Sequence, residues 1–71
     1  MEKLELLQTI TKDYLTNGRS DYHELLENIE MTKKSLDKSL GELLKKGYII
    51  ETLNGYIPSK LTYEFIVPLL L

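Results

Sequence analysis

A leucine stripe between Thr32 and Gly47 limits the fold more than any other feature of the sequence. Its members recur at intervals of four, three and one residues, which places them on one face of a helix that points into a core. Thr32 is a good N-cap and Gly47 is a common C-terminal stop, so the pattern predicts a helix between them. The leucines of the stripe are Leu36, Leu40, Leu43 and Leu44.

The start of the chain predicts a first helix, from about residue 2 to residue 16. Its expected apolar face consists of Leu4, Leu7, Ile10, Thr11, Tyr14 and Leu15. Leu6 falls outside this stripe, so we expect its side chain to be exposed. The pair Asn17-Gly18 tolerates the left-handed backbone that ends helices, and it sets the C-terminal boundary.

A short second helix is predicted after Ser20 and Asp21. The Asp21 carboxylate can accept hydrogen bonds from the first free amides, and Glu24 three residues later completes a pattern like a capping box. This helix is expected to end near Asn28. Its apolar face consists of Tyr22, Leu25, Leu26 and Ile29.

The pattern changes to that of a β-hairpin after the third helix. Residues 48–53 are mostly β-branched, aromatic or apolar, and they predict a strand. Asn54-Gly55 is a strong two-residue turn signal. Tyr56 and Ile57 are then expected to begin the return strand, which Pro58 confines to a sheet edge or to its last residue.

The end of the chain predicts a short helix around residues 63–65, with Thr62 as its cap. Pro68 is expected to break this helix, and Val67 before it to be extended. The last nine residues are nearly all apolar, and such a small chain has little core left to cover them. The segment is therefore a candidate partner-binding surface. Its proposed contact residues are Phe65, Ile66, Leu69, Leu70 and Leu71.

Size and composition predict one globular domain over residues 1–71. The chain is 42% hydrophobic and 28% charged, which argues against disorder. It has no cysteine, so disulfides and cysteine-bound metals are excluded, and no apolar run long enough for a membrane helix or a signal peptide. We therefore expect a cytoplasmic protein.

Positive charge is concentrated in one segment, although the net charge is −2. Residues 1–30 carry three basic and seven acidic side chains. Residues 31–46 carry five lysines against Asp37 and Glu42, and the remainder carries one lysine against two glutamates. This asymmetry points to the third helix as the surface most suited to an anionic partner.

At the residue level the sequence resembles winged helix-turn-helix DNA-binding regulators. Residues 24–36 are similar to the two-helix reading unit of that family. Residues 40–49 are similar to the end of its recognition helix and the start of its first wing strand, and Leu61-Thr62 to its return into a final helix. The resemblance implies a mainly α fold with a small β-hairpin: a three-helix core, a short wing and a C-terminal segment.

Two features depart from the family pattern. Glu30 stands where the family commonly has glycine, and a glutamate at positive φ would cost about 1 kcal/mol. We therefore expect Glu30→Gly to stabilise the chain. The predicted wing is also short and has no basic side chain at its tip. The sequence therefore argues against reading of the minor groove by this wing.

The candidate nucleic-acid surface is the third helix, whose first turns would lie nearest the base edges in a major groove. At 100° per residue, Lys34, Lys38 and Lys45 lie opposite the leucine stripe. Lys3 and Lys12, on the first helix, are expected to point away from this face. The alternative is that the lysine face is simply solvated. The proposed contacts are Arg19, Thr32, Lys33, Lys34, Ser35, Lys38 and Lys45.

Two hypotheses for function remain. The first is a sequence-specific DNA-binding regulator of transcription that places its third helix in the major groove. The second is a winged-helix interaction subunit of a phage or mobile-element transcription or replication complex. In either case the apolar C-terminus would form a homodimer or bind a larger protein. No pattern predicts an enzyme or a cofactor, and the lone His23 does not predict a metal site.

Overall fold

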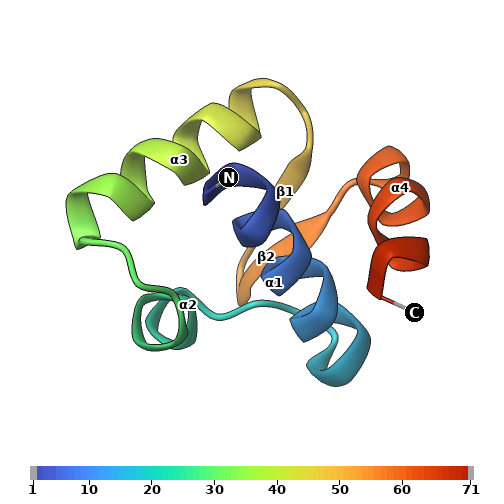
Figure 1. The fold of residues 1–71 in the computed structure, drawn as a ribbon, viewed down its shortest axis with the longest axis horizontal. Helices are drawn as coiled ribbons and strands as arrows, with labels where there is room; N and C mark the ends of the chain where they lie inside the picture. The colour runs from blue at the N-terminus through green and yellow to red at the C-terminus, as the bar shows by residue number, and fades with distance from the viewer. Residues whose placement is uncertain (1, 71) are drawn as a thin grey trace.

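The computed structural model describes residues 2–70, and it is mainly helical with one small antiparallel hairpin (Figure 1). The elements in chain order are α1 (Glu2–Asn17), α2 (Tyr22–Asn28), α3 (Lys33–Lys45), β1 (Ile49–Thr52), β2 (Gly55–Pro58) and α4 (Lys60–Leu70). In Figure 1, α1 lies between α3 and α4. Within residues 2–70, no helix combines the length and the apolar character that a membrane crossing requires.

Capping side chains and glycines set the helix boundaries where the sequence predicted them. The Asp21 carboxylate accepts hydrogen bonds from the amides of residues 23 and 24, at 2.8 and 3.4 Å. Thr32 Oγ1 accepts one from the amide of Ser35 at 3.1 Å. Gly18 and Gly47 follow α1 and α3 with φ of 83° and 77°, in the left-handed region that ends helices.

The core is a cluster of aliphatic side chains from α1, α2, α3 and β1. Its buried members are Leu6, Ile10, Leu25, Ile29, Leu36, Leu40, Leu43 and Ile49. The predicted stripe of α3 is confirmed, with three leucines buried and Leu44 packed against the cluster. Burial of these side chains stabilises the fold by roughly 1.5–3 kcal/mol each.

The prediction for the inward face of α1 is confirmed for Ile10 and Thr11, which are fully buried, but it was wrong at three other positions. Leu6 is fully buried, whereas Leu4 and Leu15 are about 39% and 49% exposed. Helix α1 packs against α4 as well as against the core cluster, so its buried surface is wider than one stripe. Thr11 is also fully buried; its hydroxyl donates to the Leu7 carbonyl at 2.8 Å, which removes the cost of burying it.

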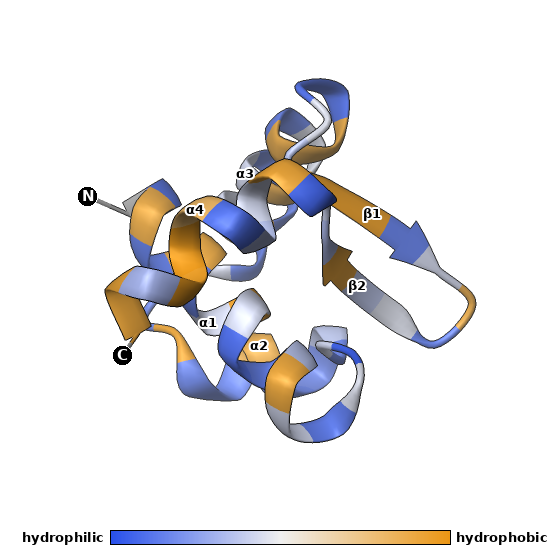
Figure 2. Ribbon diagram, turned by 90° about the vertical axis from the view of Figure 1, so that its right-hand side faces the viewer, coloured by the Kyte–Doolittle hydropathy of each residue, from blue (hydrophilic) through white to orange (hydrophobic). Residues whose placement is uncertain are grey.

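The hairpin forms where predicted, but its turn lies one residue earlier. Thr52 pairs with Gly55, so the two turn residues are Leu53 and Asn54. Thr52 Oγ1 donates to the Gly55 carbonyl and accepts from the Asn54 amide, at 3.0 and 3.3 Å. Pro58 ends β2, as expected. The hairpin extends away from the helices (Figure 2).

Ser20 extends the hairpin into a third, one-residue strand. Its amide and carbonyl exchange hydrogen bonds with those of Tyr56, both at 2.8 Å. Ser20 is fully buried, and its hydroxyl donates to the Asp13 carboxylate at 2.9 Å. These bonds attach the return strand to the connection between α1 and α2.

Helix α4 is longer than predicted at both ends. Its cap is Ser59, whose Oγ accepts from the amide of Thr62 at 3.4 Å, and Thr62 itself is buried. Pro68 lies inside the helix and does not break it. Proline has no amide hydrogen, so the carbonyl of Glu64 lacks its usual helical hydrogen bond. Both Pro68 and Glu64 are exposed. Water can therefore satisfy that carbonyl, and the helix continues.

Ile66 was wrongly assigned to the partner surface, because it is fully buried. It lies on the face of α4 that packs towards the rest of the fold. Phe65 and Leu69 are 64% and 54% exposed and remain available, and Leu70 is half-buried. Leu71 lies outside the described residues.

We predict that Gly55→Ala destabilises the protein by about 2–3 kcal/mol. Gly55 has a φ of 148°, and an added Cβ would lie 2.3 Å from the Ser20 carbonyl oxygen. Gly41→Ala is the matched control, since a Cβ there meets nothing within 4 Å. It should stabilise α3 by about 0.5–1 kcal/mol. Urea unfolding measures both, and equal stabilities would show that Gly55 is not constrained by Ser20.

Candidate nucleic-acid interface

A tight turn joins α2 to α3. The Met31 amide donates to the Ile29 carbonyl at 2.8 Å, which closes a three-residue turn centred on Glu30. Among residues 2–70, only glycines have positive φ, so the expectation of a strained Glu30 was wrong. The turn needs no left-handed residue. Glu30→Gly is therefore expected to destabilise the fold through its added unfolded-state entropy.

A hydrogen bond between side chains also links α2 to α3. Tyr22 Oη, on α2, donates to Asp37 Oδ1, on α3, at 2.5 Å. The carboxylate acceptor, together with burial, raises the pKa of Tyr22 to about 12. The sequence predicted Tyr22 only as part of an apolar face. Asp37 carried no signal of this role, because its partner is 15 residues away.

The outer face of α3 carries the predicted lysines, all exposed. Lys34, Lys38 and Lys45 recur at intervals of four and seven residues, opposite the buried leucines. Gly41 occupies the same row, and no atom outside the backbone of its own helix lies within 4 Å of where its Cβ would be. These four positions therefore form one exposed row along α3, in which Gly41 contributes no side chain.

The first turn of α3 presents Thr32, Lys33 and Ser35, which are also exposed. The Thr32 hydroxyl oxygen is occupied as the helix cap, but its proton remains free to donate. The structure thus brings six of the seven predicted contact residues onto one helix and its cap.

Arg19 does not join this surface. It lies in the connection between α1 and α2 and lines a hollow with Asn17, Asp21 and Glu24. The carboxylates of Asp21 and Glu24 line the same hollow, which makes it a poor site for a phosphate. In Figure 1 this connection and α3 are on opposite sides of the molecule.

Lys3 contacts α3, contrary to the expectation that it points away. Its ammonium pairs with the Glu42 carboxylate. This contact, followed by the charges of Lys38 and Lys46, lowers the pKa of Glu42. Glu42 is thus held among three lysines beside the basic row. Helical periodicity is consistent with Glu42 on this flank, but it gives no indication of a partner 39 residues away.

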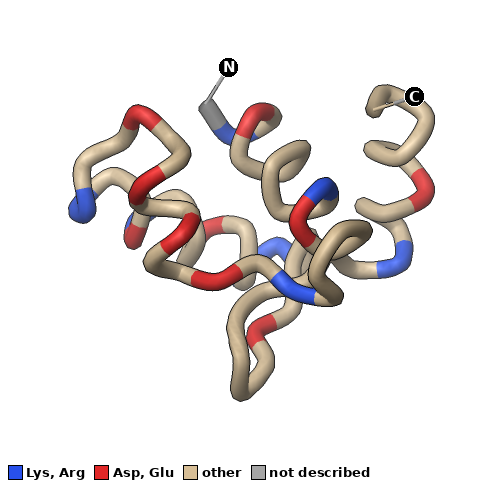
Figure 3. Tube along the Cα trace, turned by 90° about the horizontal axis from the view of Figure 1, so that it is seen from below, with Lys and Arg blue, Asp and Glu red and all other residues tan. Residues whose placement is uncertain are grey.

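The hairpin adds no positive charge at its tip. Leu53, in the turn, is fully exposed, and the exposed residues Thr52 and Asn54 flank it. Seen from below, basic positions lie among acidic ones along the trace (Figure 3). The candidate interface is therefore confined to α3, where positive side chains share one face.

The described residues contain no group of three or more histidine, cysteine, aspartate or glutamate side chains placed to hold a metal ion. No protein-family model, curated protein sequence or solved structure matches the chain. The case for function therefore rests on the geometry of α3 and its surroundings.

We predict that Tyr22 titrates about two pH units above an ordinary tyrosine, whose pKa is about 10. Because the folded-state pKa is raised, this hydrogen bond stabilises the fold fully below pH 10, and its contribution is lost as the pH rises towards 12. Phenolate absorbance should therefore show a late-titrating component that is lost in Tyr22→Phe, beside the contribution of Tyr56, whose pKa burial also raises. In Asp37→Asn the Tyr22 component should shift back towards pH 10. Unchanged titration curves in both variants, with the fold intact, would rule out the bond.

Proposed function

We propose that this chain is a winged helix and that α3 binds duplex DNA in the major groove. Three observations support the fold assignment: the order of helices and hairpin, the Ser20 bridge that completes a three-stranded edge, and the tight α2–α3 turn. The Tyr22–Asp37 hydrogen bond holds α2 and α3 at one angle. A rigid two-helix unit can present its second helix to a groove without first becoming ordered.

The row of lysines on α3 is the observation on which the proposal depends. Lys34 and Lys45 are 11 residues apart, which is about 16 Å along the helix axis. Among the described residues, none of the three lysines of the row is in an ion pair. Their ammonium groups are therefore available to neutralise phosphates and release counterions.

The gap at Gly41 favours close approach of a backbone to the middle of this row. An α-helix fits the major groove, and its first turns lie nearest the base edges. In this orientation Ser35 and Thr32 reach phosphates or bases, and the amides at the start of α3 favour an anion. We infer a sequence-specific regulator of transcription, in which Lys34, Lys38 and Ser35 contact the DNA.

We predict that Lys38→Ala weakens DNA binding and flattens its salt dependence. Loss of one phosphate contact should reduce the slope of log affinity against log salt by about 0.9. Lys12→Ala is the matched control, because it removes the same charge from an exposed position on α1. Fluorescence anisotropy with labelled duplex at several salt concentrations measures both slopes. Equal losses for the two variants, or no binding by the wild type at low salt, would refute the proposal.

Glu42 is predicted to limit the affinity of this surface. Its carboxylate engages Lys3 and lies within the fields of Lys38 and Lys46. Glu42→Gln removes that competing anion and frees an additional ammonium, so binding should strengthen by about three- to tenfold at low salt. Glu24→Gln, at an exposed position on α2 beside Arg19, is the control with the same change in charge. A Glu42→Gln variant that binds no better than this control would show that Glu42 lies outside the interface.

A further inference from the structure

The exposed side of α4 is an apolar stripe that no part of the described chain covers. Leu61, Phe65 and Leu69 recur at intervals of four residues and are 70%, 64% and 54% exposed. The fold has other residues for its own core, because Thr62 and Ile66 on the adjacent face of α4 are buried. The fold therefore does not need the stripe for its core, and its exposure lowers the solubility of the protein. An exposed apolar stripe of this kind marks an interface.

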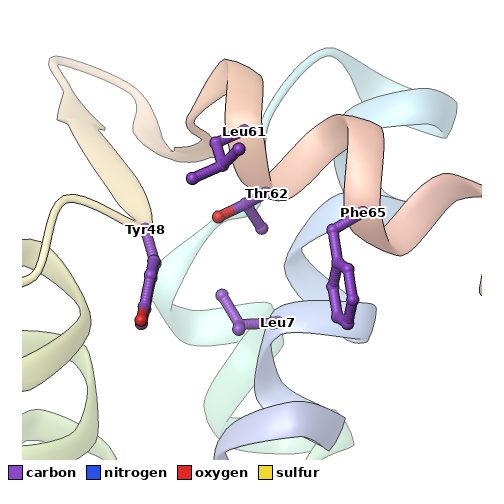
Figure 4. Close-up of a pocket in the computed structure, with 5 residues that line it drawn as sticks. All are labelled: Leu7, Tyr48, Leu61, Thr62 and Phe65. Atoms are coloured by element: carbon purple, nitrogen blue, oxygen red, sulfur yellow. The ribbon is translucent and has the colours of Figure 1, made fainter.

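An open hollow lies beside the stripe. Leu7 forms its floor, and the rings of Tyr48 and Phe65 stand on either side, with Leu61 and Thr62 above (Figure 4). Its volume is about 420 Å³. A cavity of roughly 150 Å³ accommodates a benzene ring, so the hollow has room for one aromatic side chain with space around it.

We propose that this surface binds a second copy of the same chain about a two-fold axis, with Phe65 of each copy entering the hollow of the other. A two-fold interface requires one surface to carry both the projecting group and the site that receives it. Here Phe65 projects from α4 at the rim of a hollow of sufficient size. A partner of any other kind would need only one of these two features.

Two exposed charges on α4 also complement each other across a two-fold axis. Lys60 and Glu64 lie one turn apart on α4, both exposed, and neither is in an ion pair among the described residues. A two-fold axis that passes between them apposes Lys60 of each copy with Glu64 of the other. In the proposed dimer these two ion pairs flank the apolar contact made by Phe65.

The area of the patch suits a reversible dimer. Tyr48 and the three exposed side chains of α4 present roughly 400 Å² of apolar surface, since large side chains contribute about 150–250 Å² each. With its polar rim, this is near the lower limit of roughly 600–800 Å² per partner that specific interfaces bury. The dimer is therefore expected to dissociate in the micromolar range rather than to be permanent.

Sedimentation equilibrium of the full chain tests the proposal. The apparent mass should rise from one copy towards two with increasing concentration, and Phe65→Asp should weaken the association at least about tenfold. Leu53→Asp is the matched control, because it places the same charge at a fully exposed apolar position on the hairpin. If Phe65→Asp fails to fold by circular dichroism, Leu61→Ser removes a more exposed member of the same stripe.

A charge swap separates a second copy from any other partner. Glu64→Lys alone should weaken association about three- to tenfold, and the double variant Lys60→Glu, Glu64→Lys should restore it. Only a surface that pairs with itself regains complementarity in this way. A wild type that stays monomeric at high concentration overturns the proposal. The proposal is also overturned if Phe65→Asp leaves the dimer's affinity unchanged, or if the double variant fails to restore association.

Discussion

The close approach of Gly55 to the backbone of Ser20 is the constraint on which the arrangement of the fold depends. Ser20 exchanges two hydrogen bonds with Tyr56, and its hydroxyl binds Asp13 on α1. The next residue, Asp21, caps α2. One short segment thus fixes α1, α2 and the hairpin relative to one another. No side chain fits between the two backbones, so the contact needs glycine at position 55.

This junction determines how α3 is presented. The third helix packs its leucines against α1 and α2, and β1 follows it after only three residues. The hairpin therefore anchors the end of α3, while the turn at Glu30 and the Tyr22–Asp37 bond anchor its start. Both ends of the helix are held, and its lysine face is left free. Rigid presentation of this kind is what a recognition surface requires.

The helices and the hairpin were predictable from the sequence because their signals are local. Thr32, Asp21 and the glycines after α1 and α3 act within one turn of backbone, and all set the expected boundaries. The failures share a different cause. Leu6 is buried in the cluster that α1 shares with α2, α3 and β1, and Ile66 on the face of α4 that packs towards the rest of the fold; no local pattern encodes either contact. Pro68 was read as a helix breaker, yet its exposure lets water satisfy the carbonyl it orphans.

The same division applies to the candidate site. The exposure of Lys34, Lys38 and Lys45 follows from helical periodicity opposite the leucine stripe, so the sequence located the face. The sequence did not reveal that Lys3 holds the Glu42 carboxylate beside that face, because the two residues are 39 positions apart. Such a pair matters in a chain with a net charge of −2, where few cations are available to an anionic partner. One copy offers a short row of phosphate contacts, and each contributes only a modest factor to affinity. Two copies related by a two-fold axis would double that row while the linked binding events reinforce each other. The proposed α4 dimer would thus compensate for the weak charge of a single α3, although each surface can be tested without the other.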